Sequence, residues 1–270
     1  MAITRIGNPA LADVREPNFR NIVINGDMSI AQRSTSVTGV GDGDSGYHTV
    51  DRWRFGESGS PSAVFTQSQS TDVPTGQGFA TSLKMDVTTA DASLGANDTL
   101  LLEQRTEAQN LQYLKFGTSS AESITMSFWV KSNKTGTYIC LLFSIDDTRH
   151  ISQSYTINSA NTWEKKTITF PGDTVGIIDN DNGLGFITRW YLGAGSDYTS
   201  GTLQTSWGSE TNANMAVGQV NLADSTSNEW YVTGAQLEAG TSASDFEFLP
   251  VDINKNRCEF PAFLKKYLSH

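Results

Sequence analysis

Aromatic side chains that could hold a sugar ring occur in two settings along this chain. Trp190, Tyr191, Tyr198 and Trp207 lie at or within a long polar stretch, residues 193–228, which is rich in Gly, Ser, Thr and Asn. A stretch of that length usually carries contacts at the surface, so we expect these four side chains to be exposed and to bind a glycan. Aromatic residues are also enriched at subunit contacts, which is the alternative. The other four tryptophans fall in predicted strands, where framework packing is expected: Trp53, Trp129, Trp163 and Trp230.

A run of alternating oxygen ligands is the second candidate site. It reads Asp179-Asn180-Asp181-Asn182-Gly183. Calcium prefers oxygen ligands, so Asp179 and Asp181 are predicted calcium ligands. No acidic residue closes the run at its twelfth position, as a complete calcium loop requires, and an ordinary polar turn is the alternative. No other cofactor is expected, because the two Cys and three His are scattered and form no zinc pattern.

Residues for catalysis form no recognisable constellation. No serine lies in a Gly-x-Ser-x-Gly turn, and His48, His150 and His270 lie in a loop, at the start of a predicted strand and at the last position. Carboxylates are plentiful, but most fall in predicted turns, so a carboxylate pair for glycoside cleavage is the weaker alternative. We therefore expect that this protein is not an enzyme. The enzymatic alternative is a polysaccharide depolymerase.

Charge and composition narrow the classes of partner. The chain has 270 residues and a formal net charge of −10, which disfavours a nucleic-acid partner because phosphate binding needs clustered Lys and Arg. No apolar run approaches the length of a membrane span, so no membrane insertion is expected, and the first residues do not read as a secretory signal. Cys140 and Cys258 are expected to be free thiols in a chain made in a reducing cytoplasm.

The elements that must position these residues are mainly strands. Residues 123–131 alternate between apolar and polar side chains, and a turn leads to a second apolar strand over residues 137–144. Residues 21–24 are predicted to open the domain as a strand that pairs with residues 229–238, near the far end of the chain. Ten to eleven strands with such long-range closure predict an all-β fold, an antiparallel β-sandwich of jelly-roll type with one short helix, over residues 107–116, and a C-terminal helical tail.

The ends of the chain differ in character from the centre. Residues 1–20 carry two prolines and little periodicity, which indicates an extended N-terminal arm ahead of the sandwich of residues 21–250. The tail, residues 251–270, is predicted to form a helix starting near Pro261. Its apolar stripe could pack on its own sandwich or on another subunit, and we assign it to assembly: Phe263, Leu264, Tyr267 and Leu268.

Three groups of motifs carry a resemblance to known proteins. Asn21-Ile-Val-Ile-Asn-Gly-Asp-Met28, Ala31-Gln-Arg-Ser-Thr35 and Asp51-Arg-Trp53 resemble the opening of bacteriophage virion proteins of the tail fibre type. Ser127-Phe-Trp-Val-Lys-Ser132, followed by Gly136-Thr-Tyr138, resembles their central hairpin.

The closing segment extends the resemblance over roughly residues 18–258. Thr233-Gly-Ala-Gln-Leu-Glu-Ala-Gly240, Phe246-Glu-Phe-Leu-Pro250 and Arg257-Cys258 are similar to the end of those virion proteins, although their Cys-Gln-Arg-Tyr-Tyr ending is absent here. The arm Ala2-Ile-Thr-Arg-Ile-Gly-Asn-Pro9 resembles the start of marine-phage relatives. The opening strand, centre and end are more distantly similar to carbohydrate-binding modules of the jelly-roll type.

The resemblance implies a structural protein of a bacteriophage particle, assembled in the host cytoplasm and located in the virion. Its expected partners are other virion proteins, further copies of itself in a homotrimer, and a glycan of the host surface. A tail fibre or appendage subunit for host attachment is the first hypothesis. A capsid or tail decoration or adaptor protein that binds no receptor is the alternative.

Overall fold

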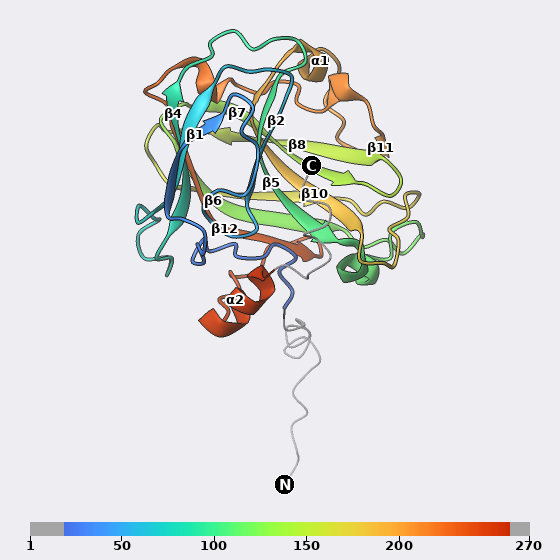
Figure 1. The fold of residues 1–270 in the computed structure, drawn as a ribbon. Coiled ribbons are helices and arrows are strands. Elements are labelled where there is room, and N and C mark those ends of the chain that lie inside the picture. The colour runs from blue at the N-terminus through green and yellow to red at the C-terminus, as the bar shows by residue number, and fades with distance from the viewer. Residues whose placement is uncertain (1–18, 260–270) are drawn as a thin grey trace.

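The computed structural model describes residues 19–259, which form two six-stranded antiparallel sheets packed face to face (Figure 1). The first sheet has the order β1 (Ser36–Gly41), β3 (Val64–Ser70), β4 (Ser82–Thr89), β12 (Glu229–Ala239), β6 (Ile124–Ser132) and β9 (Glu164–Phe170). The second has the order β11 (Gly208–Ser209), β8 (Arg149–Ile157), β7 (Gly136–Ser144), β10 (Leu184–Ala194), β5 (Thr99–Glu107) and β2 (Arg54–Ser58).

The strand order identifies the sandwich as a jelly roll. Late strands lie between early ones in both sheets: β12 lies between β4 and β6, and β10 lies between β5 and β7. The eight strands β4-β12-β6-β9 and β5-β10-β7-β8 thus form the two sheets of a double Greek key, and β1, β2, β3 and β11 extend their edges. The predicted fold class, an antiparallel jelly-roll sandwich, is confirmed.

The core lies between the sheets and follows the alternation of the strands. On β6 the four apolar residues that share a face, Ile124, Met126, Phe128 and Val130, are fully buried, as their spacing predicts. Trp53 and Trp190 meet in this core with ring centroids 5.1 Å apart. Large aromatic rings of this kind contribute much of the apolar area that stabilises a sandwich.

The opening segment, residues 21–24, differs in local geometry from the strand predicted there. Residues 21–24 form bends rather than the predicted strand, because the side chain of Asn21 takes bonds that a strand ladder would use, accepting from the backbone N–H groups of Val23 and Leu237. The pairing with β12 is still present in part, since the Ile22 N–H donates to the Leu237 carbonyl at 2.8 Å. Residues 245–249, which follow β12, form no strand.

Helices are short in the described residues. The helix predicted over residues 107–116 is a 3-10 helix, η3 (Ala108–Leu114), which buries Ala108, Leu111 and Leu114. Residues 195–225 contain α1 (Ser196–Thr199), η4 (Asn212–Asn214) and η5 (Leu222–Asp224). No helix within residues 19–259 has the length and apolar character needed to cross a membrane.

The part of the tail that the structure describes contains a helix, and the helix predicted to start near Pro261 lies outside the described residues. Helix α2 (Val251–Cys258) follows Pro250 and lies at one end of the sandwich, below β12 in Figure 1. Its Cys258 packs with Ile24 and Ile30, and Cys258 and Cys140 are both buried free thiols. The arm residues 1–18 and the predicted assembly stripe, Phe263, Leu264, Tyr267 and Leu268, lie outside the described residues.

Candidate functional site

An open groove crosses the outer face of the second sheet over β2, β5 and β10. It has a volume of about 360 Å³. Its lining is mostly polar and charged, with side chains from the three strands and from residues 198–215. The residues that matter for its chemistry are Arg54, Glu103, Arg105, Arg189, Tyr191 and Tyr198.

The groove exists because the rest of this sheet face is covered. On β7 the outward residues Ile139 and Leu141 form a second apolar cluster with Met215 and Ala216, which come from the polar stretch after β10. Hydrogen bonds hold this cover in place: the hydroxyl of Ser152 on β8 donates to the Met215 carbonyl at 2.8 Å. The polar stretch is therefore packed on its own sheet, and β5 and β2 form the floor of the groove beside it.

Three guanidinium groups converge on one buried carboxylate in the floor. Glu103 accepts from Arg54 Nη1 at 2.9 Å, from Arg105 Nε at 3.1 Å and from Arg189 Nε at 3.3 Å. Burial works to raise the pKa of the Glu103 carboxyl, but Arg189, Arg105 and Arg54 outweigh it and hold that pKa below its ordinary value. Glu103 therefore stays ionised and fixes three guanidinium groups along one face of the sheet.

Two of the four predicted glycan residues, Tyr191 and Tyr198, line this groove. Tyr191 lies on β10 under the cover, with 1% of its surface exposed, and its hydroxyl donates to the sulfur of Met215 at 3.6 Å. Tyr198 is half-buried, and its hydroxyl lies 3.3 Å from the hydroxyl oxygen of Ser58 on β2. The two tyrosines thus contribute to the groove from β10 and from the segment after it.

The other two predicted glycan residues lie elsewhere. Trp190 is fully buried between the sheets, so the expectation that it is exposed is wrong. Neighbouring residues on a strand point to opposite faces, so Tyr191 can face the groove only if Trp190 faces the core. Trp207 is half-buried and does not line the groove: its ring stacks on Phe186, and its Nε1 donates to the Pro171 carbonyl at 2.7 Å.

The predicted calcium ligands lie in a turn whose carboxylates accept backbone hydrogen bonds. Asp181 accepts from the Gly183 N–H at 2.7 Å, and the Asp179 N–H donates to Asp146 at 2.9 Å. Burial, and then the nearby charges of Asp179, Asp181 and Asp147, raise the pKa of Asp146. Within residues 19–259 no group of three or more His, Cys, Asp or Glu is arranged to hold a metal ion. Calcium binding by Asp179 and Asp181 stays a prediction.

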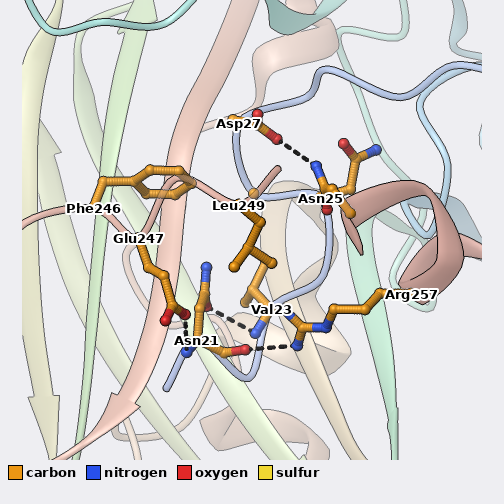
Figure 2. A pocket seen from close by; sticks show the side chains of 10 residues that line it. Asn21, Val23, Asn25, Asp27, Phe246, Glu247, Leu249 and Arg257 are labelled. Atoms are coloured by element: carbon orange, nitrogen blue, oxygen red, sulfur yellow. Dashed lines mark hydrogen bonds between the residues drawn. The ribbon is translucent and has the colours of Figure 1, made fainter. Parts of the chain in front are cut away.

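A narrow crevice, shown in Figure 2, separates the opening segment from the closing segment and α2. Asn21 is its centre. Its backbone N–H donates to Glu247, its carbonyl accepts from Arg257, and its side chain bonds to Val23 and to β12. The crevice has a volume of about 10 Å³, which corresponds to about one water molecule. The geometry is that of a structural joint between distant parts of the chain.

Gly26 is required at this joint. Its carbonyl accepts from the Ala235 N–H at 2.9 Å, and a Cβ at position 26 would lie 2.0 Å from the Ala235 carbonyl oxygen. Asn25 extends the joint, because its side chain donates to the carbonyls of Ile30 and Asp51, and its own carbonyl accepts from Trp53 Nε1 at 3.1 Å. The residues of the opening and closing motifs therefore hold the opening and closing segments of the sandwich together.

No motif in the sequence singles out Glu103 and its three arginines. Only Glu103 and Arg105 carry a local signal, since they are two residues apart and share one face of a strand. Arg54 and Arg189 reach Glu103 through strand pairing, in which both lie directly opposite Glu103. Knowledge of the strand order would have been needed to find them.

Comparison with solved structures finds proteins of similar architecture at low identity. The tailspike protein 4 enzymatically active domain of bacteriophage CBA120 is 13% identical with a TM-score of 0.44, over 83% of this chain and 22% of that one. A family 4 carbohydrate-binding module is 12% identical with a TM-score of 0.39, over 80% of this chain and 97% of that one. A family 11 carbohydrate-binding module of a Clostridium thermocellum cellulosomal cellulase is 15% identical with a TM-score of 0.35, over 78% and 99%.

Comparisons of sequence give no match. No protein-family model matches the chain, and no curated protein matches it. The chain spans 22% of the length of the tailspike domain. The jelly-roll assignment rests on the strand order described above.

Proposed function

We propose that this protein binds a glycan in the groove over β2, β5 and β10 and does no chemistry on it. The observation that carries the proposal is the groove itself, an open space of about 360 Å³ with the half-buried Tyr198 and fixed charged groups along its walls and floor. A sugar offers hydroxyl groups and one apolar ring face. Tyrosine presents an apolar ring with a polar tip, and side chains anchored on strands hold their geometry more closely than side chains on loops.

The carboxylate in the groove floor, Glu103, favours binding over hydrolysis. Glycoside cleavage needs a carboxylic acid that holds a proton for the leaving oxygen. Glu103 has a lowered pKa under its three arginines, so it holds no proton near neutral pH. Burial raises the pKa of Glu57, so among these two carboxyls Glu57 is the one that can hold a proton, and the assay below tests whether the groove cleaves a glycan.

The test is glycan binding by the full chain and by two tyrosine variants. Tyr198→Ala removes a ring from the groove, and Tyr113→Ala removes a ring that is 46% exposed in η3 and does not line it. On an array of neutral and acidic polysaccharides, we expect the wild type and Tyr113→Ala to bind the same glycans and Tyr198→Ala to bind them about tenfold more weakly. New reducing ends in the bound polysaccharide would contradict the non-enzymatic assignment.

We further propose that the protein is a structural component of a bacteriophage virion, in a fibre or appendage that attaches to the host surface. Support comes from the resemblance of its opening, central and closing motifs to virion proteins of the tail fibre type. The opening and closing motifs meet at Asn21 and Gly26, so they belong to one structural joint rather than to scattered similarities. Immunogold labelling of purified particles should place the protein on the tail, and its absence from particles would contradict the proposal.

A second candidate, a decoration or adaptor subunit, is favoured by the surface at the α2 end. A hollow of about 440 Å³ lies between the segment after Phe19, the end of β5 and α2. Phe19 and Val251 at this end are 53% and 70% exposed. The fibre proposal includes a homotrimer, so the solution mass separates the two: a stable trimer supports the fibre, and a monomer favours a subunit that depends on other virion proteins.

A further inference from the structure

The chemistry of the groove floor points to a particular class of glycan. We propose that the bound glycan carries an anionic group, a carboxylate or a sulfate, which Arg54, Arg105 and Arg189 hold against the floor of the groove. This inference rests on the proposed glycan-binding function, and it adds the charge of the ligand. The overall charge of the chain is −10, whereas the groove is lined by as many arginines as acids.

The arginine side chains, rather than the carboxylate, are exposed to solvent. The side chain of Glu103 is 2% exposed, whereas those of Arg54, Arg105 and Arg189 are 22%, 33% and 21% exposed. Each guanidinium has five N–H donors, about fifteen in all, and one carboxylate offers about four acceptor positions. Glu103 therefore orients the three groups without saturating them, and a ligand that enters the groove meets their outer N–H edges.

Two other carboxylates line the groove, so the arginines and acids are equal in number there. They differ in how they are presented. Glu57 is tied to the Gly43 N–H, and its second oxygen is buried. Glu210 is exposed in the segment after β11 and belongs to none of the three strands that gather the arginines. The floor is therefore the cationic part of the site.

An anion suits this floor better than a hydroxyl group. A carboxylate or sulfate can accept two parallel N–H bonds from one guanidinium, which a single hydroxyl cannot. Arg189 is further held by the ring of Phe143, with its guanidinium carbon 5.3 Å from the ring centre. Preorganised donors of this kind bind an anion without having to give up side-chain freedom on binding.

The test is affinity electrophoresis of the full chain in native gels that contain one polysaccharide each. Two matched pairs separate the two anion types: polygalacturonate against its methyl ester, and dextran sulfate against dextran. The variants are Arg105→Gln, which leaves Glu103 two guanidinium groups, and Arg105→Lys. Lysine keeps the positive charge but lacks the two parallel N–H donors of a guanidinium. Lys165→Gln is the control, because it removes one exposed positive charge from β9 of the other sheet. Thermal melting confirms that each variant is folded.

We expect one polyanion to retard the wild type while its neutral partner does not. Arg105→Gln should weaken that binding about tenfold, Arg105→Lys less, and Lys165→Gln not at all. Equal retardation by a neutral partner, or unchanged binding in Arg105→Gln, would overturn the anionic ligand and leave the glycan-binding function standing. If neither polyanion binds while a neutral glycan on the array does, the anionic ligand is equally overturned. If no glycan binds in either assay, the proposed function itself fails.

Discussion

His150 gives this protein a pH dependence that can be predicted from its position. The side chain lies on β8 and is fully buried, and neither ring nitrogen has a hydrogen-bond partner within residues 19–259. The segment above it is bonded to the same strand, since Gln204 Nε2 donates to the His150 carbonyl at 2.9 Å. Burial, and then the positive charge of Arg189, lower the pKa of His150 from 6.5 to about 4.

The direction of the effect follows from where the proton binds. In the unfolded chain His150 takes up a proton as the pH falls through 6.5, whereas in the folded protein it resists protonation until the pH reaches about 4. Acid therefore stabilises the unfolded chain over that window, and stability that is fully present above pH 6.5 is lost on the way down. Between about pH 7.5 and about pH 4.5 the loss from this one residue is about 2.5 kcal/mol, or roughly 5–10 °C in Tm.

The variant His150→Phe isolates this contribution. Phenylalanine keeps a ring of similar size and removes two buried nitrogens that lack partners, so the variant should be at least as stable as the wild type near pH 7.5. Urea unfolding at a series of pH values gives the free energy of unfolding of both proteins. Their carboxylates titrate alike and cancel in the difference, so we expect the wild type to lose about 2.5 kcal/mol more than the variant by about pH 4.5. Parallel pH profiles for the two proteins would refute the reasoning.

Three further substitutions test the closure, the core and the groove floor by urea unfolding. Gly26→Ala places a Cβ 2.0 Å from the Ala235 carbonyl oxygen, so the variant should lose about 1–3 kcal/mol of stability and yield less soluble protein. A wild-type value would show that the joint can move. Trp190→Ala empties a fully buried site and should cost about 3–5 kcal/mol, and a cost near zero would restore the exposed platform predicted from sequence. Glu103→Gln leaves three guanidinium groups without their carboxylate and should cost about 3 kcal/mol, less in high salt. If Glu103→Gln were as stable as the wild type at every salt concentration, the ion pairs of Glu103 in the groove floor would be contradicted.

The parts of the fold that could be predicted are those that depend on local patterns. The alternation of residues 124–130 marks β6 and its buried face without knowledge of its neighbours. The turn at residues 132–136 marks where β6 ends and β7 begins, but the two strands lie in different sheets, so the hairpin expected there is wrong. The jelly-roll class followed from the number of such strands together with the expectation that the ends of the chain meet.

The opening segment was wrongly predicted to be a strand because its polar side chains form long-range hydrogen bonds as well as favouring a turn. Asn21 and Asn25 use their side chains to bond to distant backbone groups, including Leu237 and Asp51. Such bonds replace the hydrogen bonds of a strand ladder. In the sequence, however, the segment is only a short apolar run followed by a turn. Propensity alone could not separate the two, since these bonds join Asn25 to a residue 26 positions away and Asn21 to one 216 positions away.

The groove shows what a strand rule can predict and what it cannot. Alternation along β10 already implies that Trp190 and Tyr191 face opposite sides, so one member of that predicted pair had to lie outside any shared site. Which of the two faces the groove depends on the sheet that β10 joins. The polar stretch after β10 looked exposed from its composition, but it packs Met215 and Ala216 against the outer face of β7.

The topology that makes the fold also makes the groove floor. Arg54 and Arg189 lie 49 and 86 residues from Glu103 in the sequence, and both reach it only because β5 lies between β2 and β10. In a jelly roll the late strand β10 enters between two early strands, so residues from distant parts of the chain come to share one sheet face. A change of register by one residue between β5 and β10 would turn Arg189 toward the core and remove it from the floor. The specificity that we propose for this protein is therefore tied to its strand register, and no single motif in the sequence carries it.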